Sequence, residues 1–600
     1  MDTKEIFPET KAYTSFKGLG GMPVTMEKIE EELAKWPLDG LLGFLAIVSS
    51  DAINKGQDFF DPRQQAGYMN QAIVDDFPAS LPYVSNMYAP GRVPHTGGRH
   101  LFIHELNLAR LAHLAILHAT EGSRTETICY DLTRRVCRLL LIINDLSPGE
   151  RVKTETILRS LVERRNLALE WLRYNQFNRF FNRRHVTMAK LARQQILLLD
   201  ILPKFFKGTE TAFQDATNGV SLRRYFEILA LILSHVYEGI KPGKQWFQKQ
   251  VINSKLKGGV REVDLIFQRW TRTPDEYRER FSNWSSSCPL SGLEWFDFVP
   301  LRETPLIEAR PDEFVAPVLP FLLAKIEDDP YFILSDYLGN RRDFQKAIGL
   351  AYEQYAAGLV ERISRGDSGG AWAYEHSPVI KTNNQLADDY LQRREIGICF
   401  EHKGGRPGTE YLRGGKGDRL LGPVESVLVR LDQKEVISFK EGVNLDEGIL
   451  TRGMWQQCIH GVDLVSWAEG KNGERPSVLW PIITTLTNLQ IDNVVYLVYI
   501  TPLIEAAQLY KDNYWQKPQW IQIADLEALA SLSEKGKLNL SALLQKKSQL
   551  HKNKRFDVFL YEQFDGKDTI DKNLLDKFGK LCEDAMVTFF EELLEPINAF

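Results

Sequence analysis

Cysteine is scarce in this 600-residue sequence, and no two of its six cysteines form a CxxC pair. Such widely separated cysteines exclude a disulfide framework and a zinc ribbon, and they favour reduced thiols in a cytosolic protein. Long apolar runs are also missing, since none approaches the roughly 18 residues that span a bilayer. The opening residues, MDTKEIFPETK, lack the apolar core of a signal peptide. We therefore expect a soluble cytoplasmic protein with no membrane partner.

The net charge is small as well. Lys and Arg number 74 against 79 Asp and Glu, which gives a net charge of −5. This balance excludes a histone-like polycation but not a local basic groove, because nucleic-acid binding depends on where the charges lie. Hydrophobic residues at 44% and charged residues at 26% are typical of a packed protein. At roughly 100–200 residues per domain, the length predicts two to four domains.

Proline placement and hydrophobic periodicity divide the chain into four regions. Residues 1–270 contain long proline-free segments with apolar residues at helical spacing, which predict a helical N-terminal domain. Prolines punctuate residues 271–342, which we interpret as an irregular junction and a helical connector. A mixed α/β domain follows over 343–505, and 506–600 is a helical C-terminal region. The predicted fold class is therefore a multidomain α+β protein.

Within and just before the α/β region, the expected order is helix, three strands, helix and strand. The expected helices are a pair at Phe314–Ile326 and Arg342–Ile363 and a later one at Asp446–Trp467. The expected strands are Ile396–Glu401, Ser426–Leu431, Glu435–Lys440 and Val494–Thr501. A glycine-rich loop separates the first two strands, and its GGKGD lacks the GK[ST] ending of a phosphate-binding P-loop.

Two short motifs suggest chemistry that their surroundings do not support. GDSGG at Gly366–Gly370 looks like the nucleophile segment of trypsin-like proteases, but it follows a strong helix and predicts a glycine-rich helix exit. His100 and His104 are four residues apart on an expected helix and could share a metal ion. A third ligand cannot be placed, and a partly buried polar stripe explains the pair equally.

The most basic part of the sequence lies between Arg151 and Arg193, with eleven Lys or Arg against three Glu. Its centre interleaves aromatic and Asn side chains with arginines at positions Arg173, Arg179, Arg183 and Arg184. Guanidinium groups bind phosphates, and aromatic rings stack on bases. This stretch is the candidate nucleic-acid interface. The alternative is an amphipathic helix that buries its aromatics and exposes its arginines.

The α/β region resembles the PD-(D/E)xK, or restriction-endonuclease-like, superfamily of nucleases. Members place an acidic residue at the start of the second strand and a Glu-x-Lys pair on the third, which together hold Mg²⁺ and a water against the scissile phosphate. The resemblance implies a first register in which Glu425 is the acid and metal ligand. Lys440 is then the family lysine, and Ser438 takes the place of the expected Glu. Glu353 on the entry helix and Gln456 on the later helix complete this candidate catalytic set.

A second register has the correct residue types. EHK supplies Glu401 and Lys403 as the Glu-x-Lys pair, with Asp389 as the acid twelve residues earlier. Its surroundings match less well, because LADDYLQRR around Asp389 reads as helical and a glycine-rich loop follows the pair. We favour the first register for the fold and keep the second as the alternative catalytic set.

The resemblance implies a Mg²⁺-dependent nuclease that acts on nucleic acid, of the kind found in bacterial restriction and anti-phage defence. Ser438 leaves open a second function, in which a catalytically degenerate member serves as a scaffold or sensor of a larger defence complex. A protein partner or a homo-oligomer is compatible with either function.

Overall fold

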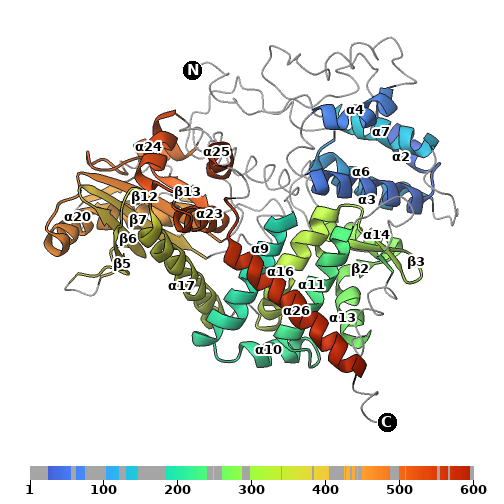
Figure 1. Ribbon diagram of the computed structural model, residues 1–600. Helices are drawn as coiled ribbons and strands as arrows, with labels where there is room; N and C mark the ends of the chain where they lie inside the picture. The colour runs from blue at the N-terminus through green and yellow to red at the C-terminus, as the bar shows by residue number, and fades with distance from the viewer. Residues whose placement is uncertain are drawn as a thin grey trace.

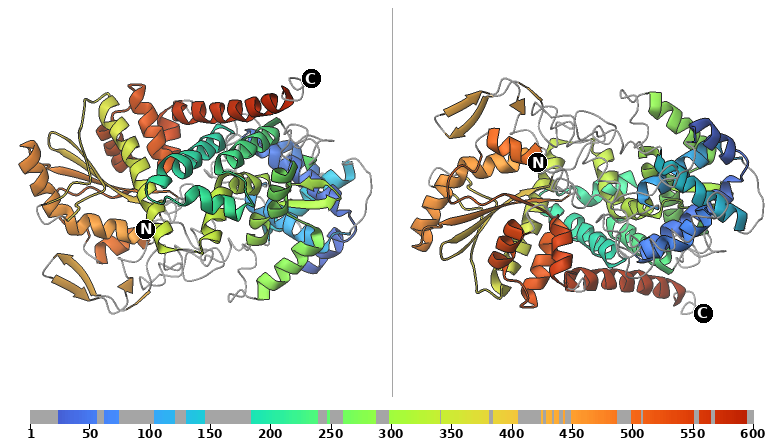
Figure 2. Two further views of the ribbon diagram at one scale, coloured as in Figure 1. Left: turned by 90° about the horizontal axis from the view of Figure 1, so that it is seen from below. Right: turned by 90° about the horizontal axis from the view of Figure 1, so that it is seen from above.

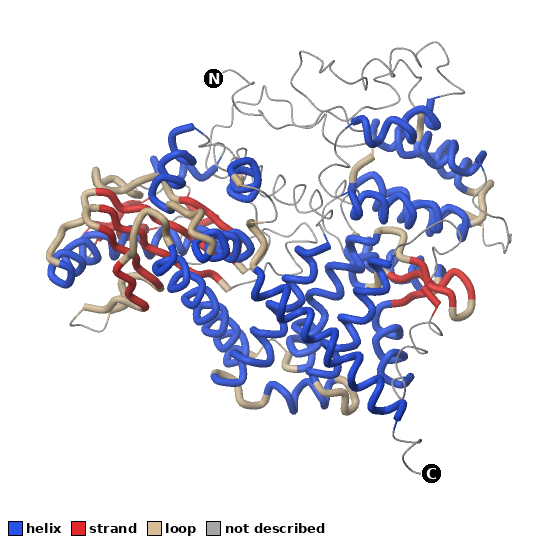
Figure 3. Tube along the Cα trace, in the orientation of Figure 1, coloured by secondary structure: helices blue, strands red, loops and turns tan. Residues whose placement is uncertain are grey.

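The computed structural model describes residues 24–55, 62–73, 103–120, 130–145, 184–238, 247–248, 260–286, 298–339, 341–380, 384–404, 424–425, 428–432, 435–438, 442–443, 449–486, 499–506, 509–550, 555–564 and 568–594. Most of these residues are helical. The strands gather in a small sheet within the helical half and a larger sheet in the other half (Figure 1 and Figure 3). The fold is therefore of mixed α+β class.

The N-terminal part of the chain is a helical region. Its helix Leu38–Lys55 is largely apolar and buries most of its circumference rather than one stripe. The first group consists of α2 (Met26–Leu33), α3 (Leu38–Lys55), α4 (Pro62–Ile73), α6 (Glu105–His118) and α7 (Tyr130–Asp145). The second group consists of α9 (Arg184–Gln195), α10 (Thr209–Ala216), α11 (Leu222–Glu238) and α13 (Val260–Trp270). A π-helical turn at Ile196–Ile201 and a 3-10 turn at Leu202–Lys204 follow α9 directly.

The predicted irregular junction contains regular elements. Residues 271–342 hold α14 (Pro274–Ser286), α15 (Val299–Glu303) and α16 (Leu319–Tyr337). A small sheet of order β1-β4-β3-β2 joins β1 (Phe247–Gln248), β2 (Thr271–Arg272), β3 (Leu306–Arg310) and β4 (Glu313–Val315). Phe314, expected to open a helix, lies in β4, and the helix begins five residues later, just before Pro320. Proline fits the first turn of a helix, where its missing N–H has no partner to lose.

The larger sheet, here called the central sheet, has five strands in the order β13-β12-β7-β6-β5. It follows α17 (Arg342–Gly366) and is built from β5 (Ala373–His376), β6 (Asp389–Arg393), β7 (Ile396–Lys403), β12 (Val478–Thr485) and β13 (Gln519–Gln522). Strands β5, β6 and β7 are antiparallel neighbours, whereas β7, β12 and β13 are parallel. A parallel pair needs a crossover, and α20 (Ile449–Asn472) lies between β7 and β12 in the chain.

Helices cover both faces of the central sheet. Helix α20 lies on one face, and α17 and α23 (Ile523–Glu534) lie on the other (Figure 2). The strand pattern agrees: Ile398 and Phe400 join the large core on the α17 face, whereas Cys399 joins a second, smaller core beneath α20. Because side chains alternate along a strand, each residue of β7 can be assigned to one of these two faces.

Between β7 and α20 the chain forms four short strands that pair only with one another among the residues described. Strand β8 (Val424–Glu425) pairs with β11 (Gly442–Val443), and β9 (Leu428–Asp432) pairs with β10 (Glu435–Ser438). They lie apart from the central sheet (Figure 2). The strands that the sequence predicts at Ser426–Leu431 and Glu435–Lys440 thus exist, but outside the central sheet.

The C-terminal region is helical, as predicted. Its helices are α22 (Thr501–Ala506), α23, α24 (Leu540–Leu550), α25 (Phe556–Gln563) and α26 (Lys572–Leu594). Two elements cross the predicted boundary at residue 505, because β13 completes the central sheet and α26 packs on α9 and α11 of the helical region. The strand expected at Val494–Thr501 is wrong at its end, where Tyr499 and Ile500 are π-helical and Thr501 opens α22.

Two buried ion pairs use basic residues of α9, and one of them joins the helical region to the α/β half. Arg193 of α9 donates from Nε to Glu527 Oε1 of α23 over 2.7 Å, and the Tyr355 hydroxyl of α17 donates to the same oxygen. Lys190 of α9 pairs with Glu327 of α16 at 3.0 Å. Two charges of the basic stretch are thus used inside the protein, which removes Lys190 and Arg193 from any phosphate-binding surface.

Candidate active site at the end of the central sheet

The site begins with a tight hairpin that sets β6 against β7. The turn has two residues, since Arg393 pairs with Ile396, and Arg394 takes a left-handed φ of 53°. This register pairs Asp389 with Phe400 and so brings Asp388 opposite Glu401. Residues Asp389–Arg393 of LADDYLQRR therefore form a strand and not a helix, and the first four of them are buried.

Glu401 and Lys403 form a buried pair on the α20 face of β7. Lys403 Nζ donates to Glu401 Oε2 over 2.9 Å, and the side chains are 15% and 4% exposed. Burial, with the Asp388 charge nearby, raises the pKa of Glu401 to about 7 although Lys403 opposes the shift. Burial alone would lower the pKa of Lys403, but the charges of Glu401 and Asp388 raise it.

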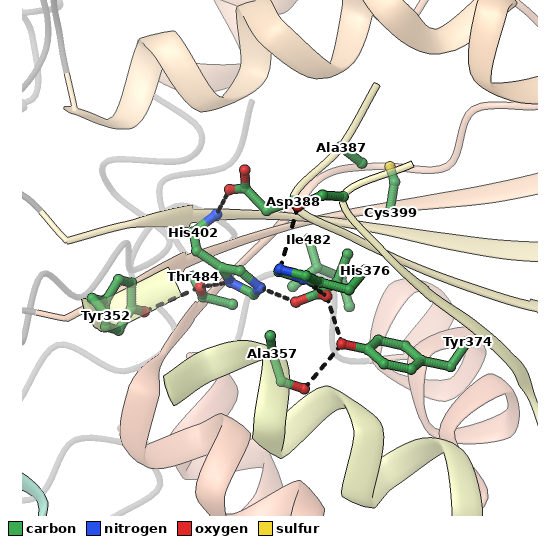
Figure 4. A network of polar contacts seen from close by, with 12 residues as sticks. Tyr352, Ala357, Tyr374, His376, Ala387, Asp388, Cys399, His402, Ile482 and Thr484 are labelled. Atoms are coloured by element: carbon green, nitrogen blue, oxygen red, sulfur yellow. Dashed lines mark hydrogen bonds and ion pairs between the residues drawn. The ribbon is translucent and has the colours of Figure 1, made fainter. Parts of the chain in front are cut away.

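Asp388 lies on the same side of the sheet as this pair. Its carboxylate points to the opposite side of the strand from the His402 ring (Figure 4). Its Oδ2 accepts the backbone N–H of His402 at 2.6 Å, and its Oδ1 accepts the Gln385 amide at 2.9 Å. Asp388 is 9% exposed, so its carboxylate and that of Glu401 are both largely shielded from water.

Glu353 of α17 completes the group of charges, here called the acidic site: Glu353, Asp388, Glu401 and Lys403. Burial raises the pKa of Glu353 to about 7, and Asp388 adds to the effect, whereas Lys403 counters it. The residue is half-buried. Three carboxylates and one ammonium therefore lie in a low-dielectric region at the end where the parallel strands β7 and β12 terminate, the usual ligand edge of such a sheet.

The opposite face at this same edge carries a second polar cluster, here called the His402 network (Figure 4). Asp389 is fully buried, and its oxygens accept from Tyr374 at 2.9 Å, His376 Nδ1 at 2.9 Å and His402 Nε2 at 2.6 Å. Burial would raise the pKa of Asp389, but these hydrogen bonds lower it. For His402, burial acts to lower the pKa, and the Asp389 contact outweighs it and raises the value.

Helix α20 contributes two glutamines with different roles. Gln457 is buried and donates to Cys399 O at 3.3 Å and Ile482 O at 3.0 Å, so its amide bridges β7 and β12. Its Oε1 accepts from the Tyr510 hydroxyl at 2.9 Å. The predicted residue, Gln456, keeps a buried Oε1 with no hydrogen-bond partner among the described residues. Gln457 thus links β7 and β12. The Oε1 atom of Gln456 could accept a hydrogen bond from a bound group.

The first register does not come together in the central sheet. Glu425 is in β8 and Ser438 is in β10, and these strands belong to two different two-stranded sheets. Lys440 lies outside the described residues. Of the first catalytic set, Glu353 alone among the members that the structure describes joins the acidic site. Of the alternative set, Glu401 and Lys403 join it, whereas Asp389 faces the other way and its neighbour Asp388 takes the position.

The predicted arginines and histidines lie away from the acidic site or outside the described residues. Arg173, Arg179, Arg183 and His100 lie outside the described residues, and Arg184 is the first residue of α9. His104 precedes α6 as its N-cap, and its Nε2 lies 3.0 Å from Asn144 Oδ1 of α7. Its backbone N–H is held by Asn107 at 3.0 Å. His104 is thus a buried capping residue of α6.

GDSGG is a helix exit, as predicted. Helix α17 ends at Gly366, and Gly370 has a φ of 111° that suits glycine. Asp367 accepts hydrogen bonds from Gly369 N, Trp372 Nε1 and Leu540 N, and Ser368 donates to Leu538 O. The serine hydroxyl thus ties the helix end to the segment before α24 and is not placed beside a histidine.

Sequence reasoning missed Asp388, His402 and the Tyr352–Thr484 contact of the network. One signal was present, because the adjacent acids Asp388 and Asp389 precede a Glu-x-Lys string at a spacing that a hairpin can close. No group of three or more His, Cys, Asp or Glu side chains poised to hold a metal ion is found among the described residues. Over the same residues, no helix is both long and apolar enough to cross a membrane.

Comparison with known proteins adds no relative. No protein-family model, no curated protein sequence and no solved structure matches this chain.

Proposed function

We propose that the central sheet carries a metal-dependent phosphodiesterase site of the PD-(D/E)xK type, and that the protein is a nuclease. The observation that carries the proposal is the register of β6 and β7, which places Asp388 beside the Glu401–Lys403 pair on one face. The residue types required by the family thus occur in this second register, without the substitution by Ser438 that the first register needs.

The order of elements supports the proposal. Helix α17, strands β5, β6 and β7, helix α20 and strand β12 follow one another in the helix, three-strand, helix, strand order of that superfamily. The strands β8 to β11 are an insertion between the third strand and the second helix. The acid precedes the second strand, and the Glu-x-Lys pair ends the third strand.

Each member of the acidic site has a distinct chemical role in this proposal. Asp388 and Glu401 are hard oxygen donors that suit Mg²⁺, and Glu353 supplies a further carboxylate near them. Lys403 is held within reach of Glu401 and would orient the attacking water and stabilise charge on the phosphate. The metal, when bound, supplies Lewis-acid stabilisation of the phosphate oxygens.

The donor set fits Mg²⁺ although no three-ligand group is preformed in the described part of the chain. Mg²⁺ takes one or two carboxylates and fills its remaining positions with waters and substrate phosphate. The pKa values of Glu353 and Glu401, both raised to about 7 mainly by burial, indicate that Lys403 supplies only part of the positive charge needed to offset burial of these carboxylates. A divalent cation at this position would supply that charge.

The substrate class follows from the same chemistry. A metal–carboxylate–lysine site acts on phosphodiesters, and the basic stretch with Arg173, Arg179, Arg183 and Arg184 supplies a sequence-level candidate for holding the nucleic-acid backbone. A role in bacterial restriction or anti-phage defence remains our interpretation of a nuclease fused to a large helical region. A protein partner or a second copy of the chain is compatible with it.

Nuclease assays on plasmid DNA and RNA with Mg²⁺ or Mn²⁺ test the proposal. Lys403→Met and Asp388→Asn should each lower the cleavage rate by at least about 100-fold, the usual effect of removing a group that moves a proton or stabilises charge. Lys471→Met is the matched control, because Lys471 is a half-exposed lysine of α20 that pairs with Glu375. Lys440→Ala should also cleave normally.

Two results would contradict this assignment. Loss of cleavage in Lys440→Ala with full activity in Lys403→Met would return the site to the first register. If the wild-type protein binds nucleic acid but cuts no substrate with either metal ion, the scaffold or sensor function is favoured instead.

A further inference from the structure

The His402 network lies on the face of the central sheet that the proposed chemistry does not use. Its members come from five elements: Tyr352 of α17, Tyr374 and His376 of β5, Asp389 of β6, His402 of β7 and Thr484 of β12. A buried set of charged and polar groups is expensive to assemble in a core, and replacing it by apolar residues is often neutral or stabilising. Because the network is costly to bury and lies directly behind the acidic site, we expect a role that links the two.

Three members of the network are sequence neighbours of residues in the acidic site. Tyr352 precedes Glu353, Asp389 follows Asp388, and His402 stands between Glu401 and Lys403. Alternation along β6 and β7 sends adjacent side chains to opposite faces. The contacts that fix Asp389 and His402 therefore fix the backbone that carries Asp388, Glu401 and Lys403.

The imidazole of His402 is the centre of these contacts. Its Nε2 lies 2.6 Å from Asp389 Oδ2, and its Nδ1 lies 2.5 Å from Thr484 Oγ1. The Tyr352 hydroxyl donates to the same threonine oxygen over 3.1 Å, and its ring meets the imidazole edge-on. Fully buried, the ring has no freedom to leave this position without breaking contacts to three elements.

The backbone of His402 also takes part on the other face. Its N–H donates to Asp388 Oδ2 over 2.6 Å, so the orientation of the Asp388 carboxylate depends directly on where this residue sits. One residue thus binds Asp389 with its side chain and Asp388 with its main chain. We propose that His402 and Asp389 are positioning residues that hold Asp388, Glu401 and Lys403 in the geometry for phosphodiester cleavage; the inference rests on the proposed function.

The test compares single-turnover cleavage by the full-length protein with the variants Asp389→Asn, His402→Gln and His402→Ala. The catalytic rate constant should fall by about 10- to 100-fold in Asp389→Asn and His402→Ala, the range typical of groups that orient site residues. His402→Gln keeps one donor toward Asp389 and should recover part of the rate. The KM for DNA and the DNA Kd in EDTA should stay within about twofold, since substrate binding does not use this face.

A second readout is independent of cleavage. Mn²⁺ affinity, followed by electron paramagnetic resonance, should weaken by about tenfold in Asp389→Asn, because Asp388 loses its alignment. His113→Gln is the matched control, since His113 is an equally buried histidine whose Nδ1 lies 3.0 Å from the Tyr277 hydroxyl in the helical region. It should lower stability and leave both the rate constant and Mn²⁺ affinity unchanged.

The outcomes separate the two claims. Cleavage that is lost in Lys403→Met but fully retained in folded Asp389→Asn and His402→Ala overturns the positioning role and leaves the nuclease proposal standing. Equal effects of His113→Gln and His402→Gln on the rate constant would also overturn it, since stability alone would then explain both. If His402→Ala does not fold, Asp389→Asn and Tyr352→Phe carry the same comparison. A wild-type protein that neither cleaves nor binds Mn²⁺ refutes the nuclease proposal and the positioning role together.

Discussion

Replacing Glu401 by glutamine should stabilise the metal-free protein at alkaline pH. The carboxyl group is 3% exposed and its pKa is raised to about 7, mainly by burial. A buried carboxyl with a raised pKa prefers its proton in the folded state, so ionising it works against folding. Glutamine keeps the shape and a hydrogen-bond acceptor for Lys403 but carries no charge to desolvate.

The size and sign of the stability difference between Glu401→Gln and wild type follow from proton linkage. Between an unfolded value near 4.5 and a folded value near 7, the folded state binds more protons, so the free energy of unfolding falls as pH rises through this window. At about 1.4 kcal/mol per pKa unit, the difference between Glu401→Gln and wild type should be about 1 kcal/mol at pH 5 and about 3 kcal/mol at pH 8.

Urea denaturation in EDTA at these two pH values measures the difference, because subtracting the wild type cancels the other titrating groups. Adding Mn²⁺ should stabilise the wild type more than the variant, since binding to the folded state alone shifts its stability by mass action. The reasoning fails if Glu401→Gln is less stable than wild type at pH 8 in EDTA. It also fails if the difference does not grow with pH.

Two further predictions concern buried groups away from the site. Burial lowers the pKa of His113 to about 3, so its neutral form stabilises the fold above pH 6.5 and this contribution falls by about 2 kcal/mol between pH 7 and pH 5. The slope of unfolding free energy against pH in that range should flatten in His113→Gln, and an unchanged slope contradicts the assignment. Arg193→Met should destabilise the protein by about 3–5 kcal/mol, because it leaves the Glu527 carboxylate buried without its counter-charge. Chemical denaturation checks this value, and a loss below about 1 kcal/mol would mean that the pair is not buried in solution.

The helices could be predicted from the sequence because their signals are long and local. Helix α17 was expected over 342–363 and runs to Gly366, and the helix expected at Asp446–Trp467 is α20, Ile449–Asn472. Both carry apolar residues at helical spacing over several turns, and the glycines of GDSGG mark the end of α17. The fold class was within reach for the same reason.

The strands of the central sheet were harder to predict, since their signals conflict with common rules. Strand β12 contains Pro481 in the middle of the sheet, where proline cannot donate to the ladder and is rarely found. The sequence pattern predicts the last strand at Val494–Thr501, within a longer β-rich segment, Pro476–Ile500, that contains β12. The insertion of β8 to β11 added the opposite error, because its residues carry clear strand patterns and lie outside the central sheet.

The identity of the site acid depended on one turn. Residues 394 and 395 are Arg and Glu, not the Asn-Gly or Asp-Gly that signals a two-residue hairpin, so the sequence gives no sign of the turn. Once Arg393 is paired with Ile396, counting back along both strands pairs Asp389 with Phe400 and sets Asp388 against Glu401. A slip of one residue would exchange the two aspartates and move every side chain of β6 to the other face. The left-handed backbone of Arg394 closes this turn, 5 residues away from Asp389. The turn thereby determines that Asp388 belongs to the acidic site and Asp389 to the His402 network.

Asp388 and Asp389 should accordingly respond differently to the same Asp→Asn change. Asp388→Asn should abolish cleavage, whereas Asp389→Asn should slow cleavage and leave DNA binding intact.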